Sequence, residues 1–303
     1  MQNFIEYSSE VRQAIENKQP ILALESTIIT HGLPYPHNLE TAISLEKITR
    51  ENNVTPATIA VLNGKIKIGL SQNELEHLSR DKNVRKISRR DLAYAINQNI
   101  SAGTTVAATL FCAAKTGIKV FATGGIGGVH RGDDFDISAD LIELARNPVA
   151  VICAGAKAIL DLPRTLEFLE TFSVPVVGYR TPVLPAFYTD TTDYSLPASV
   201  NDVRSLVNML QTHWQLGMSS GVLVTNPIPV EFAIRAEKIE PLIAKAIKQA
   251  IEQNICGKEL TPFLLSEIAS STQGESIQAN IALIENNVRL GAQVAATLND
   301  CSC

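Results

Sequence analysis

Short, strongly apolar runs rich in β-branched residues alternate with longer amphipathic stretches along the chain. The apolar runs lie at 20–27, 55–70, 84–89, 118–125, 148–155, 174–179 and 221–226. They are too apolar for a sheet with one solvated face, so they predict central strands that helices cover on both faces. The Asn63-Gly64 pair inside the second run predicts a tight hairpin, and therefore some antiparallel pairing.

The stretches between these runs have the spacing of amphipathic helices. They lie at 38–50, 71–81, 104–116, 138–146, 163–172, 202–216, 230–252, 260–271 and 276–298. The two patterns together predict an α/β fold, a three-layer α/β/α arrangement with a mixed, largely parallel central sheet. Segment 180–201 holds three prolines and no clear period. Because a long loop in a compact domain is more often a lid or an edge than a linker, we expect a single catalytic domain over 1–303.

Composition narrows the classes of function. The chain has 303 residues and is 45% hydrophobic, which is enough for a large core. Lys and Arg number 26 against 31 Asp and Glu, and the basic residues form no run, which argues against nucleic-acid binding. Aromatic residues make up 5%, so the stacking platforms of single-stranded RNA readers are few. Any base recognised here is expected to belong to a free nucleotide.

The sequence also indicates a compartment. It has no run near the roughly 18 apolar residues of a membrane span, and its first residues form no apolar signal core. We therefore expect a soluble, cytoplasmic protein with no membrane partner. Its five cysteines lack the paired spacing of a zinc site and are expected to be reduced. The terminal Cys-Ser-Cys leaves metal binding or crosslinking open, although chain ends usually fray.

The first candidate for chemistry is a carboxylate at the end of an apolar run. Glu25 is followed by Ser26 and Thr27, and shortly afterwards by the segment 30–32, Thr-His-Gly. Ligands bind where strands end in open α/β sheets, so Glu25 is a candidate acid or base. The alternative is a structural Glu25 that caps a helix or pairs with a lysine.

The second candidate is the segment 123–132, which holds five glycines after a predicted strand. Glycines let backbone amides approach a ligand closely, which suits an anion such as phosphate. The spacing matches neither the P-loop nor the dinucleotide fingerprint, so a tight turn is the alternative. Further along, Ser138 is placed to cap a helix whose amides would face a polar or anionic ligand. Asp136 is a candidate ligand for a hard divalent cation, with water and substrate completing the shell.

The third candidate is Lys157, which lies among small and apolar residues after the run 148–155. Desolvation lowers the pKa of a lysine, as a nucleophilic amine requires, whereas the alternative is an ordinary solvated charge. Weaker candidates are Lys86, the Thr104-Thr105 pair, which suits both helix capping and phosphate binding, and Asn280 on an apolar helical face. Arg89 and Arg90 are expected to be surface or ion-pair residues.

Several motifs, in order, resemble those of the pseudouridine-5'-phosphate glycosidase family, also called indigoidine synthase A-like. They are ALEST, SRRDL, GTTVAATLF, FATGGIGGVHRG, FDISADL, CAGAKAILDLPRTLE, VPVVGY, GVLVTNPIP and SIQANIALIENN, within about residues 10–298. The resemblance implies an α/β/α fold, a homotrimer and one manganese-like divalent ion, Mn²⁺, per subunit. It also implies reversible conversion of pseudouridine 5'-phosphate and water to uracil and ribose 5-phosphate.

Position by position, the resemblance implies a role for each candidate. Glu25 would be the proton donor, Lys157 the nucleophile and Asp136 the metal ligand. The substrate-binding positions that it implies are Lys86, Val106, Ser138, Ala139 and Asp140, with His130 and Asn280 as further pocket residues.

The implied reaction explains why such a set is needed. Breaking a C–C glycosidic bond leaves a carbanion at uracil C5, for which the two carboxylates of ordinary glycosidases are not enough. In the implied mechanism Glu25 protonates the ribose ring oxygen, the ring opens, and neutral Lys157 adds at C1'. Loss of uracil leaves an imine that water hydrolyses. The metal would order water and nearby polar groups.

One stretch departs from the family pattern. Residues 188–202 replace the Ser-Gly pair and Arg-Val-Asp-like stretch that the family usually shows, so a changed substrate preference stays open. The alternatives are a non-catalytic phosphosugar- or nucleotide-binding protein, and a Schiff-base lyase for another phosphosugar or a contributor to indigoidine synthesis. A sugar kinase is disfavoured because no ATP motif is present.

Overall fold

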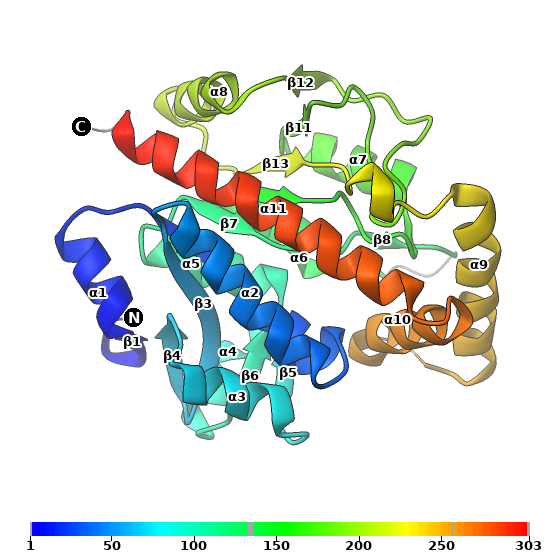
Figure 1. Ribbon diagram of the computed structural model, residues 1–303, viewed down its shortest axis with the longest axis horizontal. Coiled ribbons are helices and arrows are strands. Elements are labelled where there is room, and N and C mark those ends of the chain that lie inside the picture. Colours follow the sequence, from blue (N-terminus) through cyan, green and yellow to red (C-terminus); the bar gives the residue numbers. More distant parts are fainter. Residues whose placement is uncertain (1, 133–135, 256, 302–303) are drawn as a thin grey trace.

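A mixed sheet lies at the centre of the protein, whose computed structural model describes residues 2–132, 136–255 and 257–301 (Figure 1). Its strands are β1 (Ile5–Tyr7), β2 (Ile21–Leu24), β3 (Thr55–Leu62), β4 (Lys65–Ile68), β5 (Arg85–Ile87), β6 (Ala102–Thr104), β7 (Val120–Ala122), β9 (Ala150–Cys153), β11 (Val176–Tyr179), β12 (Ala198–Val200) and β13 (Val222–Thr225). Their order is β1-β4-β3-β2-β7-β9-β13-β11-β12, with β6 beside β3 and β5 beside β6. A separate antiparallel pair joins β8 (Val129–His130) to β10 (Leu160–Asp161).

The prediction of a mixed, largely parallel sheet is confirmed. The strands from β3 through β2, β7, β9, β13 and β11 to β12 are all parallel neighbours, and β3 pairs antiparallel with β4 and β6. Every residue of β7, β9, β11 and β13 is buried, as expected of strands covered on both faces. The β3–β4 hairpin turns at Asn63 and Gly64, whose φ angles of 49° and 72° are those of a two-residue hairpin loop.

Helices cover both faces of the sheet, so the three-layer prediction is confirmed (Figure 1). One layer contains α2 (His37–Glu51), α8 (Val203–Gln215) and α11 (Glu275–Asp300); the other contains α5 (Val106–Lys115), α6 (Ala139–Arg146) and α7 (Leu162–Thr171). The long helix α11 packs directly on β2, β7 and β9. Gly291 permits this approach, because a Cβ there would lie 3.1 Å from both Ala122 and Leu22.

The remaining helices lie around the edges of these layers. They are α1 (Ser9–Glu16), α3 (Gln72–Arg80), α4 (Leu92–Asn97), α9 (Ala236–Glu252) and α10 (Leu260–Ser271), with a π-helical turn at Ile28–Gly32 and 3-10 turns at Gln2–Phe4, Arg89–Asp91, Val230–Phe232 and Gly257–Glu259. None of the helices described here has an apolar stretch of the length that a membrane span requires. Nearly all buried apolar residues in the described chain belong to one continuous cluster, which supports our proposal of a single domain over 1–303.

Two predicted helices begin later than their sequence pattern indicates. The stretch 104–116 is helical only from Val106, because Thr105 caps the helix and residues 102–104 pair with β3 and β5. The stretch 230–252 is helical only from Ala236. There, Ile234 is 2% exposed and donates its N–H to the carbonyl of Tyr188, and Ala233 before it is extended, so the 3-10 turn Val230–Phe232 does not continue into the helix. Tertiary pairing overrides the local helical pattern in both places.

Candidate active site

The candidate site lies at the carboxyl ends of the central parallel strands. The chain runs from β2 to β3 on one side and reaches β7 on the other side of β2, so strand order reverses between β2 and β7. Such a reversal opens a crevice at the carboxyl edge of an α/β sheet. Glu25 directly follows β2, the glycine-rich loop follows β7, and Lys157 comes shortly after β9.

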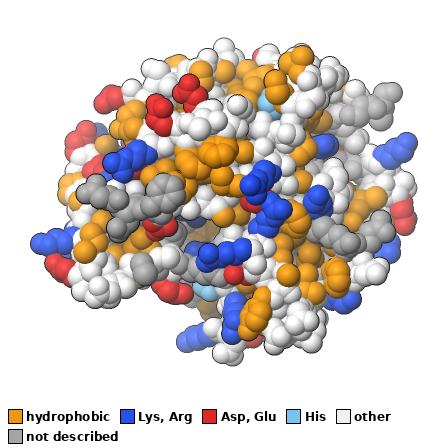
Figure 2. Space-filling model, turned by 180° about the vertical axis from the view of Figure 1, so that it is seen from behind, with side chains coloured by type: hydrophobic (Ala, Val, Ile, Leu, Met, Phe, Trp, Pro, Cys, Tyr) orange, Lys and Arg blue, Asp and Glu red, His pale blue; other side chains and the backbone are white. Residues whose placement is uncertain are grey.

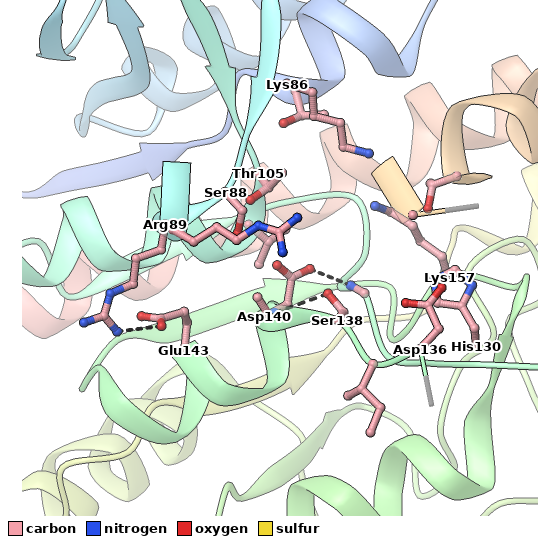
Figure 3. A pocket seen from close by; sticks show the side chains of 18 of the residues that line it. Lys86, Ser88, Arg89, Thr105, His130, Asp136, Ser138, Asp140, Glu143 and Lys157 are labelled. Carbon is pink, nitrogen blue, oxygen red and sulfur yellow. Dashed lines mark hydrogen bonds and ion pairs between the residues drawn. The ribbon is translucent and has the colours of Figure 1, made fainter. Parts of the chain in front are cut away.

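Most of the expected residues meet in one cleft with a volume of about 550 Å³. The face turned away from the α2–α11–α8 layer is hollowed, with Lys or Arg side chains and a histidine at the edge of the hollow (Figure 2). Figure 3 shows the labelled cleft residues, which come from β5 and from the starts of α5 and α6 as well as from the two loops. The expected residues that line the cleft are Glu25, Lys86, Thr105, Val106, His130, Asp136, Ser138, Ala139, Asp140 and Lys157.

The carboxyl of Glu25 is held toward its protonated form. Desolvation by the surrounding protein raises its pKa, while the positive charge of Lys157 and a hydrogen bond from the Thr123 hydroxyl oppose that rise. The Thr123 bond reaches from the strand end of β7 to that of β2 and fixes the carboxyl at the point of strand reversal. A proton donor needs a carboxyl that keeps its proton more readily than a solvated one, and the raised pKa of Glu25 shifts it in that direction.

A tight turn after β9 presents Lys157 to the cleft. The backbone N–H of Lys157 donates to the carbonyl of Ile126 at 3.1 Å, which ties this turn to the glycine-rich loop. Gly155 has a φ of 85°, and a Cβ there would collide with the carbonyl oxygen of Pro185. Only glycine accepts both conditions, so the position of the lysine depends on Gly155.

A second lysine, Lys86, enters the same cleft from β5 (Figure 3). Burial and the charge of Lys157 lower the pKa of Lys86 to about 8, although the carboxylates of Asp140 and Glu25 favour its charged form. Lys86 can therefore exchange a proton close to neutral pH. The sequence motif KISRRDL gave no sign of this, because the desolvation comes from segments distant in the chain.

Two helix N-termini face the cleft. Ser138 caps α6 by accepting from the N–H of Asp140 at 3.2 Å, and Thr105 caps α5 by accepting from Ala108 at 3.5 Å. Val106 and Ala139 are the first residues of these helices. Free N–H groups at a helix start, together with its dipole, make a site for an anion such as phosphate.

Asp140, on α6, connects the start of α5 to the glycine-rich loop beside this anion site. One carboxylate oxygen accepts from the N–H of Ala107 and the other from the N–H of Gly127, both at 2.8 Å. Its side chain is thus engaged with backbone from α5 and from the glycine-rich loop. A Cβ on Gly127 would collide with Ser138, so this close packing also requires glycine.

His130 and Asp136 lie together beside Lys157 (Figure 3). His130 Nε2 is 3.9 Å from Asp136 Oδ2. Burial lowers the pKa of His130 and the Lys157 charge lowers it further, while Asp136 opposes this. Among the described residues, no group of three or more His, Cys, Asp and Glu side chains is arranged to hold a metal ion. Asp136 can supply one oxygen ligand, and water or substrate would supply the rest.

Two expected residues lie outside the cleft. Thr104 is 0% exposed, and its hydroxyl is bonded to the carbonyl of Ile59 at 2.6 Å and to Thr109 at 2.9 Å, so it does not reach a ligand. The expectation of substrate contact at Thr104 is therefore corrected to a structural role. Asn280 lies in an adjoining cavity that also touches Glu25, Lys86 and Lys157, which we name the inner chamber. Its walls are Glu25, Thr27, Ile28, His31, Gly32, Lys86, Gly124, Gly125, Lys157, Phe187, Thr261, Pro262, Leu265 and Asn280.

Several cleft residues were not predicted as site residues. Arg89 forms the expected ion pair, at 2.6 Å to Glu143, yet it also lines the cleft with Arg90 and Arg146. Phe187, from the loop 180–201, has a φ of 61° and walls the inner chamber. A strained backbone in a site loop has no signature in the sequence pattern. The loop nonetheless forms an edge of the site, as its prolines and length indicated.

Comparison with known proteins finds relatives that match over almost the whole chain. The family model described as "Indigoidine synthase A like protein" matches residues 10–297. Pseudouridine-5'-phosphate glycosidases of Caldanaerobacter subterraneus subsp. tengcongensis and of Staphylococcus aureus are 54% and 53% identical, each covering 99% of this chain and 98% of its own length.

Two solved structures share the fold. An indigoidine synthase A-like protein of Thermotoga maritima has a TM-score of 0.90 at 34% identity, over 98% of this chain and 97% of its own. The prealnumycin C-glycosynthase AlnA, solved in complex with ribulose 5-phosphate, has a TM-score of 0.90 at 35% identity. The match covers 99% of this chain and 98% of the AlnA chain. On this evidence, the chain belongs to the indigoidine synthase A-like family.

Proposed function

We propose that this protein is a pseudouridine-5'-phosphate glycosidase, which reversibly converts pseudouridine 5'-phosphate and water to uracil and ribose 5-phosphate. The names of the relatives above support this substrate. The observation that carries the proposal is one cleft in which a carboxyl whose pKa is raised by burial, Glu25, and a lysine, Lys157, lie beside two helix N-termini. A binding protein without catalysis is not favoured, and neither is a lyase for another phosphosugar.

The phosphate end of the substrate fits the starts of α5 and α6. Thr105 and Ser138 cap these helices, and Asp140 holds their N-termini against the glycine-rich loop. Arg89, Arg90 and Arg146 add positive charge to the same cleft. The AlnA relative was solved with ribulose 5-phosphate, which supports a phosphosugar as the ligand of this cleft.

The reacting end of the substrate fits the space between Glu25 and Lys157. In the reaction we propose, Glu25 gives its proton to the ribose ring oxygen as the C1'–O bond breaks, and the neutral amine of Lys157 adds at C1'. The C1'–C5 bond then breaks, its electron pair passes to C5 of uracil, which takes up a proton, and a C=N bond forms to the lysine. Water adds to this imine, which releases ribose 5-phosphate and the free lysine. Such a step makes the enzyme a lyase.

The ion most consistent with this site is a hard divalent cation such as Mn²⁺, with Asp136 as its ligand from the protein. Asp136 is 43% exposed in its side chain and lines the cleft, whereas both oxygens of Asp140 are occupied by backbone N–H groups. When bound, the ion would order water and polar groups of the substrate. A homotrimer, which rests on the resemblance, and a cytoplasmic location, which rests on the composition of the chain, complete the proposal.

The test follows uracil release from pseudouridine 5'-phosphate by chromatography, with manganese and with a chelator. Lys157→Ala should release no uracil, while Lys47→Ala, at a lysine 73% exposed, should match the wild type. Borohydride added with ribose 5-phosphate should fix the sugar phosphate to Lys157, visible as a mass increase on one peptide. Wild-type protein that neither releases uracil nor forms C-nucleotide in reverse would overturn the proposal.

A further inference from the structure

The inner chamber has apolar walls and a few polar side chains, which is the chemistry that suits a flat, polar ring. Apolar side chains form its walls, from Ile28, Phe187, Pro262 and Leu265. Phe187 is fixed there, since its ring lies against Gly125, where a Cβ would be 2.6 Å from the ring. Besides Glu25, Lys86 and Lys157, the polar side chains that line the inner chamber include His31 and Asn280.

Asn280 is a buried amide without a partner in the described protein. It is 7% exposed, and neither its oxygen nor its nitrogen has a hydrogen bond within the part of the chain that the structure describes. The residue also lines the neighbouring cavity beside α10, so its amide is open to a ligand or to water rather than sealed in the core. An amide kept open toward a chamber points to a ligand with one hydrogen-bond donor next to one acceptor.

His31 presents a lone pair to the same chamber. It lies in the π-helical turn Ile28–Gly32, a feature often found at functional sites. Its Nδ1 is 2.7 Å from the hydroxyl of Thr30, whose own proton has an acceptor in the carbonyl of Ser26 at 3.3 Å. We therefore assign His31 the tautomer that carries its hydrogen on Nδ1 and donates it to Thr30, which leaves Nε2 as an acceptor. Burial and the charge of Lys86 lower the pKa of His31, which keeps the ring neutral.

We propose that Asn280 and His31 together read the far edge of a uracil ring joined to the sugar through carbon. Opposite C5, that edge presents N1–H, C2=O and N3–H in a row, a donor, an acceptor and a donor. The Asn280 amide pairs with C2=O and one N–H, and His31 Nε2 accepts from the other N–H. His31 is then the specificity-determining residue of this reaction, and the inference rests on the proposed function.

This arrangement selects carbon-linked over nitrogen-linked nucleotides. In uridine 5'-phosphate the glycosidic bond occupies N1, so the far edge presents N3–H, C4=O and C5–H, and one acceptor in the chamber has no donor to meet. A site built around hydrogen bonds rejects a ligand that lacks one of them, because the buried polar group stays unpaired.

The experiment measures binding of uracil, 1-methyluracil and 3-methyluracil by calorimetry, to wild type, His31→Phe and His31→Gln. Each methyl group removes one N–H. His31→Phe should weaken uracil binding on the order of tenfold or more, and His31→Gln, which restores an acceptor, should recover part of it. His77→Phe, at an exposed histidine of α3, is the matched control and should bind like wild type.

The decisive result is non-additivity. In His31→Phe, one of the two methylations should cost no further affinity, because the N–H that His31 reads is already unpaired. If both methylations weaken binding by the same factors in wild type and variant, or if the wild type binds no uracil, the inference is wrong. Uracil release from pseudouridine 5'-phosphate is measured on the same preparations. Binding that depends on His31 without any release would reject the proposed function and keep the inference.

Discussion

The hydroxyl of Thr123 donates a hydrogen bond to the carboxyl of Glu25 across the boundary between β7 and β2. The two residues are 98 positions apart in sequence and meet where the strand order reverses. This bond lowers the pKa of a carboxyl that burial raises. Thr123 therefore sets both the orientation and the acidity of the proposed proton donor.

Thr123→Val should remove that bond while keeping the shape of the side chain. We expect the pKa of Glu25 to rise further, and kcat/KM for pseudouridine 5'-phosphate to fall roughly tenfold, the effect of losing about one charge-assisted hydrogen bond. The pH profile of kcat/KM, which reports free-enzyme groups, should show its Glu25 limb moved to higher pH. Thr123→Ser should behave like wild type, and Thr225→Val, at a buried threonine on β13, is the control. An unmoved limb would contradict the role given to Thr123.

Asp140→Asn should weaken both the fold and the phosphate site. An amide can accept one of the two backbone N–H bonds, but its NH₂ group then faces the other donor. We expect a loss of about 1–3 kcal/mol in the free energy of unfolding, measured by urea denaturation. Affinity for ribose 5-phosphate should fall as well. Asp81→Asn, at the end of α3, should change neither quantity.

Lys86→Met should stabilise the protein at neutral pH while reducing its activity. The folded pKa of Lys86 is about 8, below its usual 10.5, so the folded state binds fewer protons than the unfolded state between these values. The destabilising effect of Lys86 is fully present below pH 8 and fades as the pH rises toward 10.5. The stability gain of the variant, on the order of 1 kcal/mol at pH 7, should therefore shrink by pH 10. Lys47→Met is the exposed control; a gain independent of pH would refute this origin.

Asp136→Ala should weaken manganese binding without unfolding the protein. Its carboxylate is partly exposed and its only described close partner is His130, so little packing is lost. Electron paramagnetic resonance of free Mn²⁺ should show a dissociation constant raised at least roughly tenfold, as for loss of a charged oxygen ligand. Asp202→Ala, at the exposed start of α8, serves for comparison. Equal affinity in all three proteins would place the ion elsewhere.

Local patterns in the sequence carry much of this fold. The runs that became β7, β9 and β13 are apolar throughout, which is the pattern of fully buried strands. Ser71, the first residue of the predicted stretch 71–81, begins α3 with a capping box. The strands β1, β6 and β12 were missed because none of them lies in an apolar run, and each takes its conformation from the strands beside it. Helix α4 was missed because it has only six residues.

The sequence predicted those site residues whose role shows in their immediate neighbours along the chain. Glu25 and Lys157 follow apolar strands and stand out as charges among small residues. The hydrogen bonds that Asp140 accepts from Ala107 and Gly127 could not be predicted in this way, because the two donors come from other segments of the chain. The same holds for Thr104, whose hydroxyl is enclosed by residues of β3 and α5.

The turn that presents Lys157 has a consequence for synthesis of the chain. Gly155 packs against the carbonyl of Pro185, a residue that the ribosome adds thirty positions later. A growing chain that ends before this loop lacks the carbonyl against which the turn packs. The turn after β9 is therefore fixed only once residue 185 has been added, and a chain cleaved between residues 155 and 185 should lose the placement of Lys157 in the cleft.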